Sequence, residues 1–139
     1  MNARRAPTVS AILITRDEED RLARALESVR WADEIVVVDS GSRDRTVEVA
    51  RRYTDRVHVR DWPGFGPQKQ RALELATGEW VFSLDADEAV TPELARSIRA
   101  AVADPRGRVG FEVERETCYL GHWFGRRGWA RDRVLRLFR

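Results

Sequence analysis

Residues 78–88 read GEWVFSLDADE, an apolar run that ends directly in acidic residues. The run at 80–84 predicts a strand, because it is short and mostly apolar. Asp85 and Asp87 follow it at once, and side chains two positions apart on extended backbone face the same way. We therefore expect two carboxylates to converge at the carboxyl end of a strand.

Strands and helices alternate on the N-terminal side of this stretch. Short apolar or alternating runs predict three earlier strands, at 9–14, 35–38 and 57–59. Helix-period apolar stripes and helix-end signals predict four helices, at 22–29, about 44–53, 68–76 and 91–102. This alternation predicts an α/β fold with a mostly parallel sheet and helices on both faces. Ligand sites in such folds lie at the carboxyl ends of the strands.

Particular residues predict two of the helix ends. The third helix is expected to begin at Gln68, after a Gly- and Pro-rich loop at 61–67, and to be closed by Gly78. Thr91 is expected to cap the fourth helix, with a proline in the first helical position. These two helices flank the strand at 80–84.

The C-terminal part of the chain follows another pattern. Apolar and polar residues alternate at 109–113 and again near 135–138, which predicts a β-rich segment. A Gly- and Trp-rich stretch at 117–130 joins these strands without an intervening helix. We expect residues 1–139 to form a single domain whose C-terminal part is incomplete, because the chain stops at Arg139 within an alternating run.

The charges are unevenly distributed. The 139 residues include 24 arginines and one lysine, Lys69, with a formal net charge of +2. Residues 126–139 carry six arginines against one acid, whereas the body before them is acidic. This pattern does not resemble a uniformly basic nucleic-acid binder, although the terminal arginines could contact phosphates or an anionic membrane. Since no apolar run is long enough to span a membrane, we expect a cytoplasmic protein, at most peripheral on the inner face of the cytoplasmic membrane.

Acidic residues at two strand ends suggest a binding site. Asp85 and Asp87 could together hold Mg²⁺ or Mn²⁺ and leave positions for the oxygens of a nucleoside diphosphate, or could form a solvated loop. Asp39 ends the strand at 35–38 and could accept hydrogen bonds from a ribose or base, or form a turn with Gly41. The Gly-x-Gly-x-x-Gly fingerprint of dinucleotide binders is absent after the first strand, which disfavours NAD.

Four segments, in order, carry a resemblance to a known family. They are ITRDEE (14–19), VDSGSRD (38–44), KQRAL (69–73) and ATGEWVFSLDADE (76–88). Together they resemble the successive motifs of family 2 glycosyltransferases with the Rossmann-like GT-A fold. Three segments are more particularly similar to lipopolysaccharide inner-core glucosyltransferases of bacteria, at 64–73, 121–124 and 136–139. The resemblance implies that 8–103 is the nucleotide-sugar-binding half and that 104–139 begins the acceptor half.

This resemblance also implies roles for particular residues. Nucleotide-sugar binding is implied for Thr15, Arg16, Asp17, Glu18, Asp39, Lys69 and Asp85. Binding of the Mg²⁺ or Mn²⁺ cofactor is implied for Asp87 and Asp85. Many relatives have an aromatic residue at the position of Arg16, where a planar guanidinium could stack on the nucleobase instead. The sequence therefore does not identify the nucleobase of the donor.

The implied reaction is transfer of a hexose, glucose above all, from a nucleoside-diphosphate sugar such as UDP-glucose. The acceptor would be a saccharide or a glycolipid such as the lipopolysaccharide core, and the transfer would invert the sugar carbon. An inverting enzyme uses a carboxylate as general base on the acceptor side. The candidates are Glu112, Glu114, Glu116 and Asp132, but none lies in a family motif, and we expect the base beyond Arg139.

Aromatic and basic residues near the C-terminus could contact the acceptor. Trp123, Phe124 and Trp129 could form a sugar-stacking wall, or could anchor a loop. Five arginines could hold acceptor phosphates or an anionic leaflet, namely Arg126, Arg127, Arg131, Arg133 and Arg136. Two alternatives remain open: a fragment that binds nucleotide sugar without catalysis, and a receiver-like signalling domain, which also gathers acids at strand ends.

Overall fold

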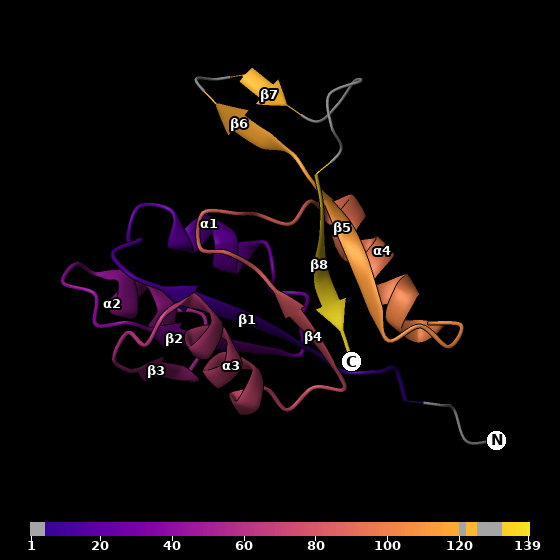
Figure 1. Ribbon diagram of the computed structural model, residues 1–139, viewed down its shortest axis with the longest axis horizontal. Helices are drawn as coiled ribbons and strands as arrows, with labels where there is room; N and C mark the ends of the chain where they lie inside the picture. Colours follow the sequence, from indigo (N-terminus) through magenta and orange to yellow (C-terminus); the bar gives the residue numbers. More distant parts are fainter. Residues whose placement is uncertain (1–4, 120–121, 125–131) are drawn as a thin grey trace.

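A six-stranded sheet with the order β3-β2-β1-β4-β8-β5 forms the centre of the computed structural model, which describes residues 5–119, 122–124 and 132–139 (Figure 1). Four of its strands are parallel: β1 (Val9–Thr15), β2 (Glu34–Asp39), β3 (Val57–Val59) and β4 (Trp80–Ser83). β8 (Asp132–Phe138) runs antiparallel to both β4 and β5 (Gly110–Arg115). The mostly parallel sheet and the β-rich C-terminal segment are therefore confirmed.

Helices cover both faces of this sheet, as the alternation predicts. They are α1 (Leu22–Glu27), α2 (Thr46–Arg51), α3 (Phe65–Leu75) and α4 (Pro92–Ala103). Apolar side chains of α1, α2 and α4 pack with Leu13 and Phe82 in the larger core. On the opposite face, α3 packs through Ala72 against Ile12 and Val36. The carboxyl ends of the parallel strands therefore lie between the helices of one face and α3 on the other.

A short hairpin, β6 (Thr117–Tyr119) and β7 (His122–Phe124), forms a separate two-stranded sheet. It stands away from the main sheet in Figure 1. Several acceptor-side expectations cannot be placed, because they concern positions or side chains outside the described residues: Trp123, Phe124, Trp129, Arg126, Arg127 and Arg131.

The strand order separates this fold from receiver-like domains. Those domains have the order 2-1-3-4-5, in which the third strand lies between the first and the fourth. Here β4 pairs directly with β1, and β3 lies at the edge beside β2. The receiver-like interpretation is therefore wrong.

Within the described residues, no helix has both the length and the apolar character that crossing a membrane requires.

Helix ends agree in part with the sequence predictions. Thr91 caps α4, since its Oγ1 accepts a hydrogen bond from the Leu94 N–H at 3.1 Å. The third helix begins at Phe65 rather than at Gln68. Gly64 makes this earlier start possible because its φ of 116° turns the chain sharply, and its carbonyl accepts from the Gln68 N–H at 3.1 Å.

Gly78 lies against β1 and does not close α3, so that prediction is wrong. Its φ is outside the left-handed region that a helix-closing glycine uses. Its N–H donates to the Ser10 Oγ at 2.8 Å. A Cβ at this position would lie 2.6 Å from the Ser10 Oγ and 2.7 Å from the Ser10 backbone N. Close approach to a buried strand therefore requires glycine here.

We expect Gly78→Ala to lower the free energy of unfolding by about 1–3 kcal/mol, because the new methyl group displaces a strand already fixed in the sheet. Gly66→Ala is the matched control, since nothing lies within 4 Å of its Cβ position in α3. It should be neutral or stabilising by up to about 1 kcal/mol. Urea unfolding of both variants measures the difference, and equal stabilities would contradict the close-approach explanation.

Candidate functional site

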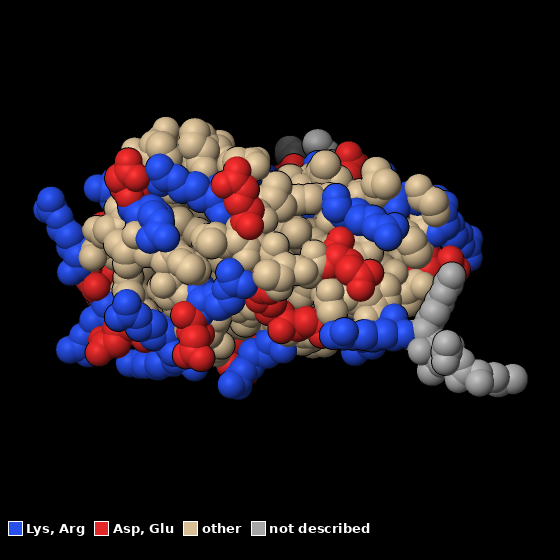
Figure 2. Space-filling model, turned by 90° about the horizontal axis from the view of Figure 1, so that it is seen from below, with Lys and Arg blue, Asp and Glu red and all other residues tan. Residues whose placement is uncertain are grey.

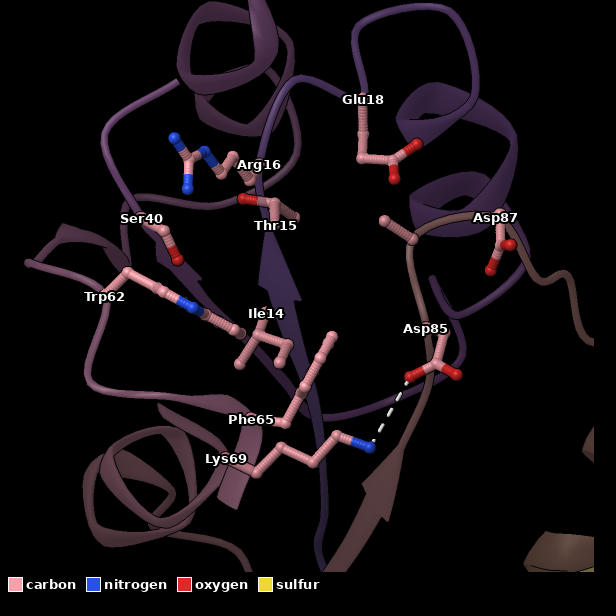
Figure 3. A pocket seen from close by; sticks show the side chains of 11 residues that line it. Ile14, Thr15, Arg16, Glu18, Ser40, Trp62, Phe65, Lys69, Asp85 and Asp87 are labelled. Atoms are coloured by element: carbon pink, nitrogen blue, oxygen red, sulfur yellow. Dashed lines mark ion pairs between the residues drawn. The ribbon is translucent and has the colours of Figure 1, made fainter. Parts of the chain in front are cut away.

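A cleft of 580 Å³ opens where β1, β2 and β4 end (Figure 3). Its walls come from the end of β1, the turn after β2, the β3–α3 loop with the first turns of α3, and the loop after β4. The lining residues are Ile14, Thr15, Arg16, Glu18, Ser40, Trp62, Phe65, Lys69, Asp85, Ala86 and Asp87. Six of the eight candidate binding residues thus meet at one cleft, whereas Asp17 and Asp39 are not part of its lining.

Asp39 is fully buried and joins β1 to the turn after β2. Its Oδ1 accepts hydrogen bonds from the hydroxyls of Thr15, at 2.8 Å, and Ser42, at 2.6 Å. Its Oδ2 accepts from the backbone N–H groups of Gly41, at 2.9 Å, and Ser42, at 2.7 Å. The turn expected as the alternative is therefore present, and four donors already surround this carboxylate. A direct contact of Asp39 with ribose or base stays a prediction.

Asp17 holds the loop after β1 against the loop after β2. Its backbone has a φ of 50°, and its N–H donates to the Ser42 Oγ at 2.8 Å. Its Oδ1 accepts from the Arg43 N–H at 2.8 Å. The next N–H, of Glu18, donates to the Thr46 Oγ1 at 2.7 Å, while the Glu18 side chain lines the cleft (Figure 3). Asp17 thus shapes the wall, and Glu18 presents its carboxylate to the cleft.

Asp85 lies between two cationic side chains. Lys69 Nζ is 3.6 Å from its Oδ1 (dashed in Figure 3), and Arg136 Nη2 is 3.2 Å from its Oδ2. Burial raises the pKa of the Asp85 carboxyl, but the hydrogen bond and charge of Arg136, together with Lys69, outweigh burial and hold this pKa below its usual range. Asp85 is therefore ionised and held in place at neutral pH.

Arg136 reaches this position from the C-terminal strand β8 and is only 6% exposed. The sequence pattern grouped it with arginines that could contact acceptor phosphates or lipid. That interpretation is wrong for Arg136, because its side chain is buried against the loop after β4. Its Nη1 also donates to the Ser83 carbonyl at 3.4 Å.

Glu88 completes the network around Asp85. Its Oε1 accepts from the Asp85 N–H at 2.9 Å and lies 3.0 Å from Arg136 Nη2. Arg115 Nη1 is 3.9 Å from Glu88 Oε2, and Arg115 also pairs with Asp132 at 2.5 Å. Burial raises the pKa of Glu88 and outweighs the lowering by the Asp85 N–H and Arg136. These contacts tie the loop after β4 to both β5 and β8.

Asp87 differs from Asp85 in its surroundings. Its side chain is exposed and makes no hydrogen bond or ion pair within the described part of the chain. No group of three or more His, Cys, Asp or Glu side chains that could enclose a metal ion occurs in the described ranges. Mg²⁺ is often bound through one or two carboxylates plus substrate phosphates. The oxygen donors of Asp87 and Asp85 fit such an ion, and none of the described residues places a competing cation on Asp87.

The candidate general bases lie away from the lining of the cleft. Glu112 and Glu114 are exposed on β5, and Arg133 Nη2 is 3.6 Å from Glu114 Oε1. Glu116 follows β5, and Asp132 begins β8 and pairs with the end of β5. We therefore assign no catalytic base among the described residues.

Sequence reasoning missed four residues in and beside the cleft, namely Ser40, Trp62, Phe65 and Glu88, and gave Arg136 a different role. The Gly and Pro content of 61–67 predicted a loop, and two aromatic side chains within this Gly- and Pro-rich loop were the available signal for Trp62 and Phe65. Arg136 gave no such signal, because only the pairing of β8 with β4 brings it to Asp85.

On the face shown in Figure 2, basic and acidic side chains alternate without a broad area of one sign. Nucleic-acid binders use a continuous basic surface to neutralise phosphates. This face gives no support to nucleic-acid binding, which the charge pattern of the sequence also disfavours.

Comparison with known sequences finds glycosyltransferases. The profile described as "Glycosyl transferase family 2" matches residues 10–137. The lipopolysaccharide core biosynthesis glycosyltransferase LpsC from Rhizobium meliloti is 35% identical over 136 residues, 94% of this chain and 50% of LpsC. The uncharacterized glycosyltransferase RC0292 from Rickettsia conorii is 40% identical over 99 residues, 70% of this chain and 35% of that protein. The chain thus spans half or less of the length of these relatives.

Solved structures show the same fold. Mannosyl-3-phosphoglycerate synthase from Rubrobacter xylanophilus superposes with a TM-score of 0.65 at 28% identity, over 75% of this chain and 38% of that one. The mannosyltransferase PcManGT from Pyrobaculum calidifontis, in complex with GDP-Man and Mn²⁺, gives a TM-score of 0.61 at 28% identity, over 77% of this chain and 35% of that one. The fold is that of GT-A glycosyltransferases.

We expect Arg136→Met to lower the free energy of unfolding by about 1–3 kcal/mol, because it leaves two half-buried carboxylates without their shared cation. Arg133→Met, on the exposed face of the same strand, is the control and should change stability by less than about 1 kcal/mol. The double variant Arg136→Met, Glu88→Gln should lose less free energy of unfolding than the sum of the losses in the two single variants. Additive losses in chemical unfolding would show that these groups do not interact.

Proposed function

This chain belongs to glycosyl transferase family 2, and we propose that it binds a nucleoside-diphosphate sugar with Mg²⁺ or Mn²⁺ in the cleft. The observation that carries the proposal is the convergence of six candidate residues on one 580 Å³ space. These residues belong to motifs that lie far apart in the sequence and meet only because β1, α3 and β4 are neighbours.

The two ends of the cleft suit different parts of such a donor. Thr15 and Glu18 offer oxygen atoms to ribose hydroxyls, and Lys69 offers a positive charge to phosphate oxygens. Asp87, with Asp85 beside it, is where the divalent cation would bind. When bound there, the ion would offset the negative charge that grows on the departing diphosphate. Lys69, already held next to Asp85, would orient the same phosphates.

The relatives support a more specific reaction. The solved structure of PcManGT is a complex with GDP-Man and Mn²⁺, which supports a metal-dependent sugar donor in a fold like this one. The name of LpsC supports the lipopolysaccharide core as acceptor. We accordingly propose transfer of a hexose, with glucose as the first candidate, to a saccharide or glycolipid of that core with inversion. Peripheral contact with an anionic membrane through the basic C-terminal segment is part of the same proposal.

Titration of the protein with UDP-glucose and with GDP-mannose, each with and without MnCl₂, tests the donor site. We expect at least one donor to bind, with an affinity that rises when Mn²⁺ is present. Calorimetry measures both quantities. The proposal would be contradicted if neither donor bound, whether MnCl₂ was present or absent. Transfer of the sugar to a core oligosaccharide separates a transferase from a protein that only binds the donor.

Asp87→Asn should remove most of the increase in donor affinity that Mn²⁺ produces, because it takes away a cleft carboxylate that has no ion-pair partner among the described residues. Asp104→Asn is the matched control, since Asp104 is exposed beside Arg106 and lies outside the cleft. The control should keep the wild-type response to Mn²⁺. An unchanged Mn²⁺ response in Asp87→Asn would refute the metal assignment.

A further inference from the structure

Two exposed aromatic side chains line the cleft and have no role in the site as described so far. Trp62 is 40% exposed and Phe65 is 73% exposed. Their ring centroids are 4.9 Å apart with the planes at 90°, so the edge of one ring meets the face of the other. Of the exposed large apolar side chains in the described residues, only these two are aromatic and only these two line the cleft.

The loop that carries Trp62 is tied down on both sides. Before it, the Arg60 N–H donates to the Asp39 carbonyl at 2.8 Å. Arg71 Nη1, from α3, lies 3.0 Å from both the carbonyl and the Oδ1 of Asp61. After it, Gly64 makes the turn that begins α3. The open position of Trp62 is therefore built into the fold, although burial of an indole would stabilise the protein.

The cleft has a charged end and an aromatic end. Asp85 and Asp87 lie on one side, and Trp62 lies across from them, next to Ser40 and near Arg16 (Figure 3). The phosphates of a donor belong with Lys69 and the carboxylates that would hold the metal, so the planar base falls on the opposite side. An indole is a face on which any base can stack.

We propose that Trp62 is the stacking surface for the nucleobase of the donor and that Phe65 fixes the plane of its indole. This inference rests on the proposed function, since it names the part of the donor that binds at the aromatic end. Arg16, on the same side of the cleft, then contributes its charge near the base rather than the only planar surface.

Binding of UDP, UDP-glucose, GDP and inorganic pyrophosphate, each with MnCl₂, tests the proposal by calorimetry. Trp62→Ala should weaken binding of the preferred nucleotide by about tenfold or more, the usual effect of losing one base–aromatic stack. Pyrophosphate has no base, so its affinity should stay within about twofold. Trp62→Phe should retain most of the nucleotide affinity, because a smaller aromatic ring remains, and should lose part of the fluorescence quenching that the nucleotide causes.

Val109→Ala is the matched control, since Val109 is exposed and apolar but lies outside the cleft. Thermal unfolding should show that all variants are folded, with at most a small loss of stability in Trp62→Ala, which removes the ring contact with Phe65. An equal loss of affinity for nucleotide and pyrophosphate in Trp62→Ala would overturn the proposal, and would indicate that Trp62 only maintains the conformation of its loop. A loss confined to UDP-glucose, with UDP unaffected, would assign it to the sugar instead. Wild-type protein that binds neither nucleotide would overturn the proposed function itself, whereas normal nucleotide binding by Trp62→Ala overturns only the stacking role.

Discussion

The buried guanidinium of Arg136 connects the C-terminal strand to the loop that carries the cleft carboxylates. A guanidinium removed from water is costly unless carboxylates and carbonyls replace its hydration. Asp85, Glu88 and the Ser83 carbonyl fulfil this condition only when β8 lies beside β4. The same contacts that make burial of Arg136 tolerable therefore fix the position of the acidic loop relative to the sheet.

Asp39 acts in a comparable way on the other side of the cleft. Its carboxylate is buried but accepts four hydrogen bonds, which join the end of β1 to the turn after β2. Asp17 adds a second set of links between the loops that follow these strands. Both walls of the cleft are thus held by acidic side chains whose oxygens bind the protein itself. Glu18 also lines the cleft, with one oxygen paired to Arg21 at 2.9 Å, and Asp87 has no such partner among the described residues.

The sequence predicts much of this arrangement, for reasons that are local. Apolar runs fix the four parallel strands, and Thr91 caps its helix as its position suggests. Motif order predicts which strand ends carry the site, since carboxyl ends of parallel strands meet at one edge. The start of α3 was predicted too late, because the backbone turn at Gly64 depends on conformation and not on composition.

Long-range pairing explains what the sequence did not predict. Arg136 looks like one of several terminal arginines until β8 is placed between β4 and β5. Gly78 has the position of a helix-closing residue, yet its contact with Ser10, 68 residues away, is what requires glycine. Alternation along a strand shows which residues share a face, but not which neighbouring strand that face meets.

The separation of charged and aromatic ends gives the cleft a direction. A ligand with phosphates at one end and a planar ring at the other can bind in a single orientation, because reversal would place the phosphates against Trp62 and away from Lys69. Asp85 does not compete for this orientation, since Lys69 and Arg136 already balance its charge. Asp87, beside it, has no cationic partner among the described residues. A divalent cation bound to Asp87 would offset its negative charge and so let anionic phosphates approach.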